Sequence, residues 1–369
     1  MNVSAAALST NVKFRAFLER QDVHLDFRTI FITAMGAMVH GLFASLLIGT
    51  IMRTLGQHVP GLGFLVEFGD YAVSVTGAAM AVAIGYALKA PPFVLCSLLA
   101  VGAAANTLGG AGGPLAVFFV ALIALYAGKL VSKTTPVDII VTPFVTVLVG
   151  VLAAKSLAPP IGAAAAAVGS FVMWATDLQP LLMGIIVATV MGFVISGPLS
   201  SAALAAAFGL TGLAGAAALA GCAAHMVGFA VASWRENKAG GLISQGIGTS
   251  MLQLPNLHRK PILWLPAVAA AAVAGPIATA VFGLEQNGPP IASGMGTSGL
   301  VGPIGMVTGW FSPSEQAILA GATPIHPGSA QWLEMILVLV VIPAIVALVV
   351  SEIMRKRGLI KLGDLKIDD

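Results

Sequence analysis

Long apolar stretches separated by short polar segments run through the whole chain. About ten of them approach the roughly 20 residues that an α-helix needs to cross the hydrocarbon core of a bilayer. They lie at residues 27–52, 63–88, 91–108, 112–131, 138–156, 159–175, 180–206, 211–233, 261–283 and 332–354. The pattern predicts an all-α polytopic membrane protein with about ten transmembrane helices. A broken helix within the small-residue run at 180–233 would change that number by one.

Two glycine-rich segments interrupt the apolar pattern. They read Gly-Ile-Gly-Thr-Ser-Met at 246–251 and Gly-Met-Gly-Thr-Ser-Gly at 294–299, and prolines flank both. In hydrocarbon an unpaired peptide group is costly, so irregular backbone persists there only when it is buried in protein or lines a wet cavity. These first and second Gly-Thr-Ser segments are therefore predicted to be re-entrant or broken and to border a substrate site. Most other glycines, as in 184–192 and 209–221, are expected to let helices pack closely.

Composition supports a membrane location. Hydrophobic residues make up 58% of the chain, charged residues make up 9%, and the mean hydropathy is +0.96, far from the balance of a soluble domain. The net charge of +3 comes from basic residues scattered through short loops, which argues against a nucleic-acid partner. With both termini in the cytoplasm, every lysine and arginine except Arg53 and Lys155 falls on the inner side. This distribution satisfies the positive-inside rule.

The predicted organisation has three parts. An N-terminal segment at 1–26 is cytoplasmic or interfacial, a transmembrane permease domain covers 27–354, and a basic cytoplasmic tail covers 355–369. No apolar core with a small-residue cleavage site precedes the first span, so no removable signal peptide is expected. A faint internal repeat, in which features of 90–162 recur in order at 197–292, is typical of duplicated transporter folds.

No motif for catalysis emerges. The two cysteines, Cys96 and Cys222, lie in apolar segments, which argues against a disulfide framework, a cysteine metal site or a phosphoryl-carrying cysteine in a soluble loop. The histidines lack metal-ligand spacing, and the sequence contains no P-loop motif. We therefore expect no cofactor, no metal and no catalytic centre in this chain, and we do not expect it to pump with ATP alone.

Several longer motifs are specific for a known family. They lie at 110–114, 128–134, 138–143, 244–256, 275–279 and 294–302. In this order they resemble the membrane subunit, enzyme IIC, of the bacterial sugar phosphotransferase system, in the branch that includes PfoR-like regulators. The similarity covers roughly residues 27 to 355.

The resemblance implies a permease in the bacterial cytoplasmic membrane that moves a small polar solute, a sugar or related compound, inward. In the coupled system a soluble IIB partner phosphorylates the solute as it emerges. No hydrophilic IIA or IIB domain accompanies the motifs in this sequence, so separate IIA and IIB proteins are expected as partners. At most, this chain is then part of a sugar phosphotransferase complex. The resemblance also suggests a homodimer embedded in the lipid bilayer.

The two Gly-Thr-Ser segments and their flanks supply the candidate solute ligands, because a sugar needs convergent donors and acceptors in a mostly apolar cavity. The candidate side chains are Gln245, Thr249, Ser250, Gln253, Asn256, Glu285, Asn287, Thr297 and Ser298, and the candidate backbone amides are Gly248 and Gly296. A carboxylate accepts two sugar hydroxyls through charge-assisted bonds, which makes Glu285 the preferred single residue. An interfacial charge at the end of a span is the alternative for Glu285. Helix capping is the alternative for Gln245 and Asn256.

Other ionisable residues in or near the spans are candidates for proton or ion coupling. His40 and His225 fall within predicted spans, where such groups are often functional, although a neutral histidine bonded to a neighbouring helix explains each of them too. Glu67 and Asp70 share one helical face near the start of a span, which suits either an ion site or an interface.

Three hypotheses remain open from the sequence. The preferred one is a phosphotransferase-type permease component, with the solute phosphorylated on entry by separate proteins. The second is a secondary transporter driven by a proton or sodium gradient. The third is a membrane sensor that keeps the binding fold but transports nothing.

Overall fold

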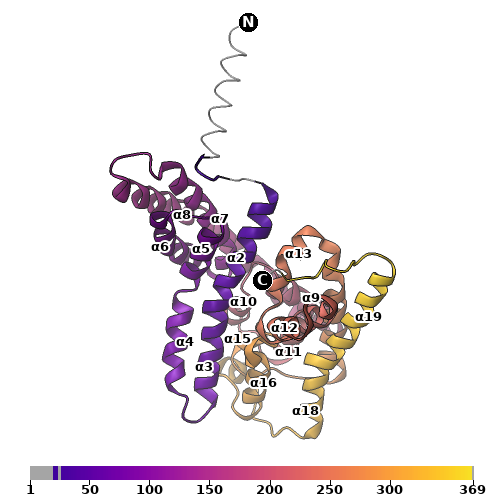
Figure 1. Ribbon diagram of the computed structural model, residues 1–369. Coiled ribbons are helices and arrows are strands. Elements are labelled where there is room, and N and C mark those ends of the chain that lie inside the picture. Colours follow the sequence, from indigo (N-terminus) through magenta and orange to yellow (C-terminus); the bar gives the residue numbers. More distant parts are fainter. Residues whose placement is uncertain (1–19, 24–25, 368–369) are drawn as a thin grey trace.

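The computed structural model describes residues 20–23 and 26–367, so most of the predicted segment at 1–26 lies outside the described residues. All regular elements in the described part are helical, with η marking short 3-10 or π-helical turns (Figure 1). The elements up to residue 207 are η1 (Thr29–Ala34), α2 (Met35–Leu42), η2 (Phe43–Leu47), α3 (Ile48–His58), α4 (Phe64–Ser74), α5 (Thr76–Ala87), α6 (Pro92–Gly109), η3 (Gly110–Gly112), α7 (Gly113–Val131), α8 (Asp138–Thr176), α9 (Pro180–Ser196) and α10 (Ser201–Ala207).

The later elements include both Gly-Thr-Ser segments. They are α11 (Gly212–Ala232), α12 (Trp234–Ile243), η4 (Ser244–Gly248), η5 (Ser250–Gln253), α13 (Leu254–Arg259), η6 (Pro261–Trp264), α14 (Leu265–Pro276), η7 (Ile277–Val281), α15 (Pro290–Ser293), η8 (Ser298–Leu300), α16 (Val301–Phe311), α17 (Glu315–Leu319), α18 (Ser329–Ile336), η9 (Leu337–Val341) and α19 (Ile342–Lys356). The all-α prediction is confirmed.

The helices pack as two groups. Figure 1 shows α5, α6, α7 and α8 on one side of the molecule and α9, α11, α12 and α19 on the other. In the first group α5 packs on α2, α6 and α7, and α8 covers α6 and α7, while η1 and η2 adjoin the two ends of α2 and belong to the same group. The apolar core of this group also takes in Met251, the last residue of the first Gly-Thr-Ser segment, and Leu254, which follows it. That segment therefore connects the two groups.

Small residues bring the helices of the second group close together. A Cβ atom at Gly184 of α9 would lie 2.8 Å from the carbonyl carbon of Gly275 in α14, and one at Gly221 of α11 would overlap the Ala188 backbone. Lipid tails are as apolar as these helix surfaces, so the helices associate through close van der Waals packing, which the small residues allow. The packing role predicted for the glycines of 184–192 and 209–221 is confirmed at these positions.

The described residues contain fewer spanning helices than predicted. Six helical stretches are long and apolar enough to cross a membrane, and α4 with α5, bent by 52°, would make a seventh. The six are Thr29–Gln57, Pro92–Val131, Asp138–Thr176, Gly212–Ala232, Pro261–Val281 and Ser329–Lys356. The second of these is divided by a turn at Gly110 (φ +50°) into α6 and α7, which pack on each other as the predicted stretches at 91–108 and 112–131. The chain is an integral membrane protein.

Helix α8 corrects one prediction. The stretches at 138–156 and 159–175 were expected as separate helices, but they form one helix of 39 residues. At about 1.5 Å per residue it is about 58 Å long, which exceeds the hydrocarbon thickness. Pro159 and Pro160 lie inside this helix. Membrane helices tolerate proline because neighbouring groups can supply hydrogen bonds to the carbonyls that lose their helical N–H partners. Conversely, the stretch at 180–206 is broken into α9 and α10, as the alternative interpretation of 180–233 anticipated.

Candidate functional site

Both Gly-Thr-Ser segments interrupt helical structure, as predicted. The first runs through the π-helical turn η4, extended backbone at Thr249 (φ −154°, ψ 139°) and the 3-10 turn η5. The second follows the one-turn helix α15, and Gly296 (φ +55°) and Gly299 (φ +52°) within it and Leu300 (φ +59°) directly after it lie in the left-handed region. Glycine at the first two of these positions makes the conformation accessible.

The two segments contact each other directly. The Thr297 hydroxyl donates to the Gly246 carbonyl at 2.5 Å, and the Ser298 hydroxyl donates to the Gly248 carbonyl at 2.9 Å. All of these polar side-chain atoms belong to buried residues. The hydroxyls of the second segment thus satisfy carbonyls that the irregular backbone of the first segment leaves without helical partners, which stabilises both segments.

Each segment is also bonded to a helix outside the pair. The Ser196 hydroxyl, at the end of α9, donates to Ser250 at 2.9 Å and lies 3.0 Å from Nδ1 of His225 in α11. The Ser201 hydroxyl of α10 donates to the Gly294 carbonyl at 2.6 Å. Sequence reasoning missed Ser196 and Ser201, although both are hydroxyls beside the Gly197-Pro198 break, where broken helices leave carbonyls to be satisfied.

A small cavity lies where the two segments meet the first helix group. Its volume is about 60 Å³. It is lined by Thr249, Met251, Gly294, Met295 and Ser298 of the segments, by Ser200, Ser201 and neighbours near α10, and by Leu42, Leu46 and Leu47 of the first group. This segment cavity holds about two waters' share of liquid volume. It is smaller than the roughly 300–1,000 Å³ of small-molecule sites, so it has to widen before a sugar fits.

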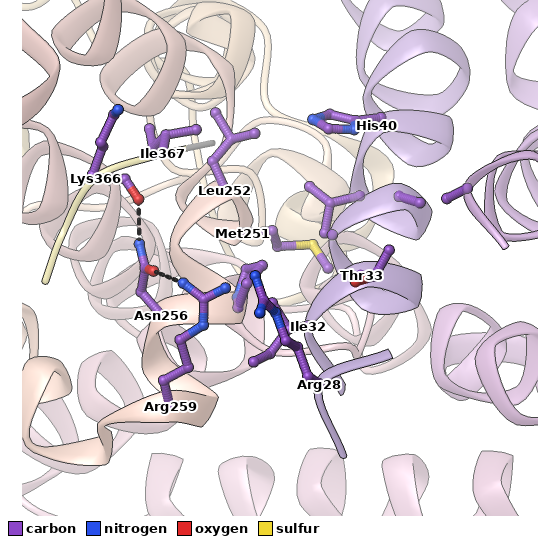
Figure 2. A pocket seen from close by; sticks show the side chains of 15 residues that line it. Arg28, Ile32, Thr33, His40, Met251, Leu252, Asn256, Arg259, Lys366 and Ile367 are labelled. Carbon is purple, nitrogen blue, oxygen red and sulfur yellow. Dashed lines mark hydrogen bonds between the residues drawn. The ribbon is translucent and has the colours of Figure 1, made fainter. Parts of the chain in front are cut away.

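A larger pocket adjoins the segment cavity. It has a volume of about 300 Å³, and Figure 2 shows its walls. It is lined by Arg28, Ile32, Thr33, Gly36, Ala37, Val39, His40 and Ala87 from the chain before α2, from η1, α2 and α5, by Met251, Leu252, Pro255, Asn256 and Arg259 from η5 and α13, and by Lys366 and Ile367 of the tail. We call it the basic pocket. Met251 lines both cavities.

Three predicted amides form a ladder behind the first segment. The Gln253 amide donates to Gln245 Oε1 at 2.9 Å, and the Asn256 amide donates to Gln253 Oε1 at 2.9 Å. The same amides also donate to backbone carbonyls of the C-terminal tail, Gln253 to Leu365 at 2.9 Å and Asn256 to Lys366 at 2.8 Å. In this conformation Gln253 and Asn256, two of the amides that were predicted to bind solute, bind the tail.

The tail is packed against the second helix group through several further bonds. Lys260 pairs with Asp364 at 2.6 Å, and Asn237 both donates to the Leu365 carbonyl at 2.8 Å and accepts from the Ile367 N–H at 3.0 Å. Burial raises the pKa of Asp364, but the hydrogen bonds from Lys260 and from the Lys361 N–H outweigh it and lower the pKa below 3.8. At neutral pH the carboxylate therefore holds the tail in place.

Two predicted ligands of the second segment lie away from both cavities. Glu285 is exposed and accepts a bond from Asn287 at 2.8 Å, and neither residue lines the segment cavity or the basic pocket. Between them, the buried Gln286 pairs by backbone with Gly212 and bonds Ser293 at 3.1 Å. Gln286 thus positions the start of the second segment. Sequence reasoning missed it because nothing distinguishes it from its polar neighbours.

The residues proposed for ion coupling are dispersed. Asp70 pairs with Arg53 at 3.0 Å and Glu67 accepts from Tyr71 at 3.1 Å, all on exposed surface. His40 is exposed in the basic pocket. His225 is fully buried among aromatic rings, and no partner for its Nε2 atom is found among the described residues. No cluster of three metal-ligating side chains occurs within 20–23 and 26–367.

Comparison with known proteins agrees with the motifs. The family model described as phosphotransferase system, EIIC, matches residues 32–367, which include both segments, the segment cavity, every residue of the basic pocket except Arg28, and the packed tail. No curated protein matches the chain.

The two segment glycines should respond differently to substitution. A Cβ at Gly296 would lie 2.8 Å from the Ala223 nitrogen, and the φ of +55° adds strain, whereas a Cβ at Gly248 meets only the movable Phe43 ring at 2.9 Å. We expect Gly296→Ala to destabilise the protein by about 2–4 kcal/mol and Gly248→Ala by about 1 kcal/mol or less. Thermal unfolding in detergent measures both, and equal losses would contradict the geometry.

Neutralising Asp364 should loosen the tail. A lowered pKa means that the stabilising contribution is complete above pH 3.8 and is lost as the pH falls through the lowered value, so Asp364→Asn imitates acid at neutral pH. The Lys361 N–H donates to Asp364 at 2.7 Å, and its hydrogen exchange should accelerate roughly fivefold, as for a partly exposed pair worth about 1 kcal/mol. Glu315→Gln, an exposed substitution elsewhere, should leave that rate unchanged.

Proposed function

We propose that this chain, which belongs to the EIIC family of the phosphotransferase system, binds a small polar solute, a sugar or related compound, and translocates it across the bacterial cytoplasmic membrane. Separate IIA and IIB proteins would supply the phosphoryl group. The observation that carries the proposal is the meeting of two broken segments at a buried, hydroxyl-bearing cavity between two helix groups. Irregular backbone at such a place is typical of transporter substrate sites.

The two cavities support a path for the solute. The segment cavity offers the hydroxyls of Thr249, Ser200 and Ser298 among apolar walls, and the basic pocket next to it has the size of a small-molecule site. Met251 lines both of them, and an unbranched methionine changes rotamer at low cost. Movement of this side chain, together with separation of the helix groups, would join the cavities and let a solute pass.

The predicted ligands have three different roles in this proposal. Thr249 and Ser298 line the segment cavity and make the first contacts. Gln253 and Asn256 become available when solute hydroxyls replace the tail carbonyls that they bind in the described conformation. Gln245, Ser250 and Thr297 hold the segments in shape through their bonds to Gln253, Ser196 and Gly246.

The proposal also includes the topology and the assembly. Both termini face the cytoplasm, because that orientation places nearly all basic residues inside. The tail that covers Gln253 and Asn256 then lies on the cytoplasmic face, where IIB would receive the solute. A homodimer is proposed from the family resemblance alone.

A binding screen tests the function. Full-length protein in neutral detergent is titrated with sugars, polyols, sugar acids and small organic acids while its thermal unfolding is followed. A ligand at about 100 times its Kd stabilises the fold by about 2.7 kcal/mol. We expect one class of polar solute to raise Tm, Thr249→Val to weaken its binding about tenfold, and Ser170→Ala on the exposed face of α8 to change nothing.

Other outcomes relocate or remove the site. Weaker binding in Glu285→Gln with normal binding in Thr249→Val would move the solute to the loop before α15. Binding that depends on sodium or on pH, with uptake by proteoliposomes lacking IIA and IIB, would favour an ion-coupled carrier. A selective ligand that is never transported would favour a sensor. No hit across the panel would contradict solute binding.

A further inference from the structure

We propose that the C-terminal tail at 361–367 is an autoinhibitory strap, which occupies the amides of Gln253 and Asn256 as an internal ligand and has to leave before a solute can bind them. The inference rests on the proposed function for the role of these two amides. It goes beyond that function because the strap then sets how tightly the protein binds its solute. We call the ion pair between Lys260 and Asp364, which holds the strap, the clasp.

The number of hydrogen-bond donors shows why the strap excludes a solute. A side-chain amide has two N–H donors. Gln253 donates one to Gln245 and the other to the Leu365 carbonyl. Asn256 donates one to Gln253 and the other to the Lys366 carbonyl, a bond that Figure 2 shows. Both amides belong to buried residues, so their donors are fully used while the strap is in place.

The strap is held by few contacts, so it can leave without unfolding a helix. Residues 361–367 form turns and irregular backbone, and Leu365 is the buried residue among them. Besides the two amides, the clasp and Asn237 hold the strap. Segments with few buried contacts and exposed backbone are the ones that open locally while the rest of a protein stays folded.

A strained residue connects the strap to the first Gly-Thr-Ser segment. Asn237 of α12 bonds the strap at two points, and directly after it Lys238 has a φ of 51° and a ψ of −148°. Residues with a side chain rarely adopt this conformation, which persists only where the surrounding structure holds it. Helix α12 leads into η4, where the first segment lies. Release of the strap therefore frees Asn237 and moves the start of that segment while it uncovers the amides.

The clasp determines how strongly the strap inhibits. When only a fraction of the molecules has an open site, the apparent affinity of a ligand is reduced by that fraction. Asp364 accepts from Lys260 at 2.6 Å and from the Lys361 N–H at 2.7 Å. Loosening this carboxylate about fivefold, as for a partly exposed pair, raises the open fraction about fivefold while most molecules remain closed.

Isothermal titration of full-length protein in neutral detergent tests the strap. The probes are glucose, mannitol, gluconate and succinate, one for each class of solute in the screen. We expect Asp364→Asn to lower the Kd of the probe that binds by about fivefold. Glu315→Gln neutralises an exposed carboxylate elsewhere and should leave the Kd unchanged.

A reversible crosslink tests the strap in the opposite direction. The variant carries Lys260→Cys and Asp364→Cys together with Cys96→Ser, which removes the exposed native cysteine, and Cys222 is buried. A short bifunctional methanethiosulfonate joins the two new thiols and closes the clasp covalently. We expect probe binding to weaken at least about tenfold after crosslinking and to return after reduction. Because the same molecules are compared in both states, a loss of fold cannot explain the difference. Asp364→Cys in the Cys96→Ser background, treated in the same way, is the control for the reagent.

The outcomes separate the strap from the proposed function. Crosslinked protein that binds a probe as tightly as reduced protein would overturn the strap and leave the permease standing. An unchanged Kd in Asp364→Asn would also overturn it. Binding seen only in Asp364→Asn and in the reduced double-cysteine variant would support the strap, because the unsubstituted protein is then closed. Binding of no probe to any of these forms would contradict both the strap and solute binding.

Discussion

The hydrogen bonds between the two Gly-Thr-Ser segments are the interaction on which the site depends. Backbone that leaves the helical conformation inside an apolar protein has to find partners for its peptide groups. Here the hydroxyls of Thr297 and Ser298 reach the carbonyls of Gly246 and Gly248 and replace the missing helical donors. The same bonds fix the distance between the segments, so the cavity beside them has hydroxyl-lined walls at a defined place between the helix groups.

Glycine residues make the irregular backbone of the segments possible, and serine and threonine residues supply its hydrogen bonds. Gly296 and Gly299 adopt positive φ angles that other residues reach at a cost, and Gly294 leaves no Cβ to collide with the Ser201 backbone, whose own hydroxyl bonds the Gly294 carbonyl. Serine and threonine then supply the donors. The repeated Gly-Thr-Ser sequence therefore suits a broken helix that remains buried, and it places Thr249 and Ser298 on the wall of the segment cavity.

The sequence predicted the class of fold and the position of its irregular backbone, because apolar length and glycine with proline are local properties. It failed where the outcome depended on the surroundings. The stretches at 138–156 and 159–175 were expected as two helices, but α8 continues from one to the other through Pro159 and Pro160. Glu285, preferred for its carboxylate, stays a prediction; it is exposed and lines neither cavity, and its buried neighbour Gln286, which the sequence did not distinguish, bonds Ser293 ahead of the second segment.

The basic pocket is a second feature that could not be predicted from the sequence. Arg28, Arg259 and Lys366 lie far apart in the sequence, and Arg28 and Arg259 lie at the ends of apolar stretches, where a cation normally marks the cytoplasmic side. Only folding brings them to one cavity, and the packed tail that delivers Lys366 was predicted merely as a basic segment. The sequence therefore could not predict this pocket, because only the three-dimensional arrangement brings its residues together.

The most direct test of the central claim is a cryo-electron microscopy map of the full-length protein with the best solute from the screen. The account predicts density for the solute between Thr249 and Ser298, in a segment cavity widened beyond its 60 Å³, with Met251 displaced or in contact with the ligand. Solute density that touches neither 246–251 nor 294–299 would contradict the account, because the broken segments would then serve the fold alone.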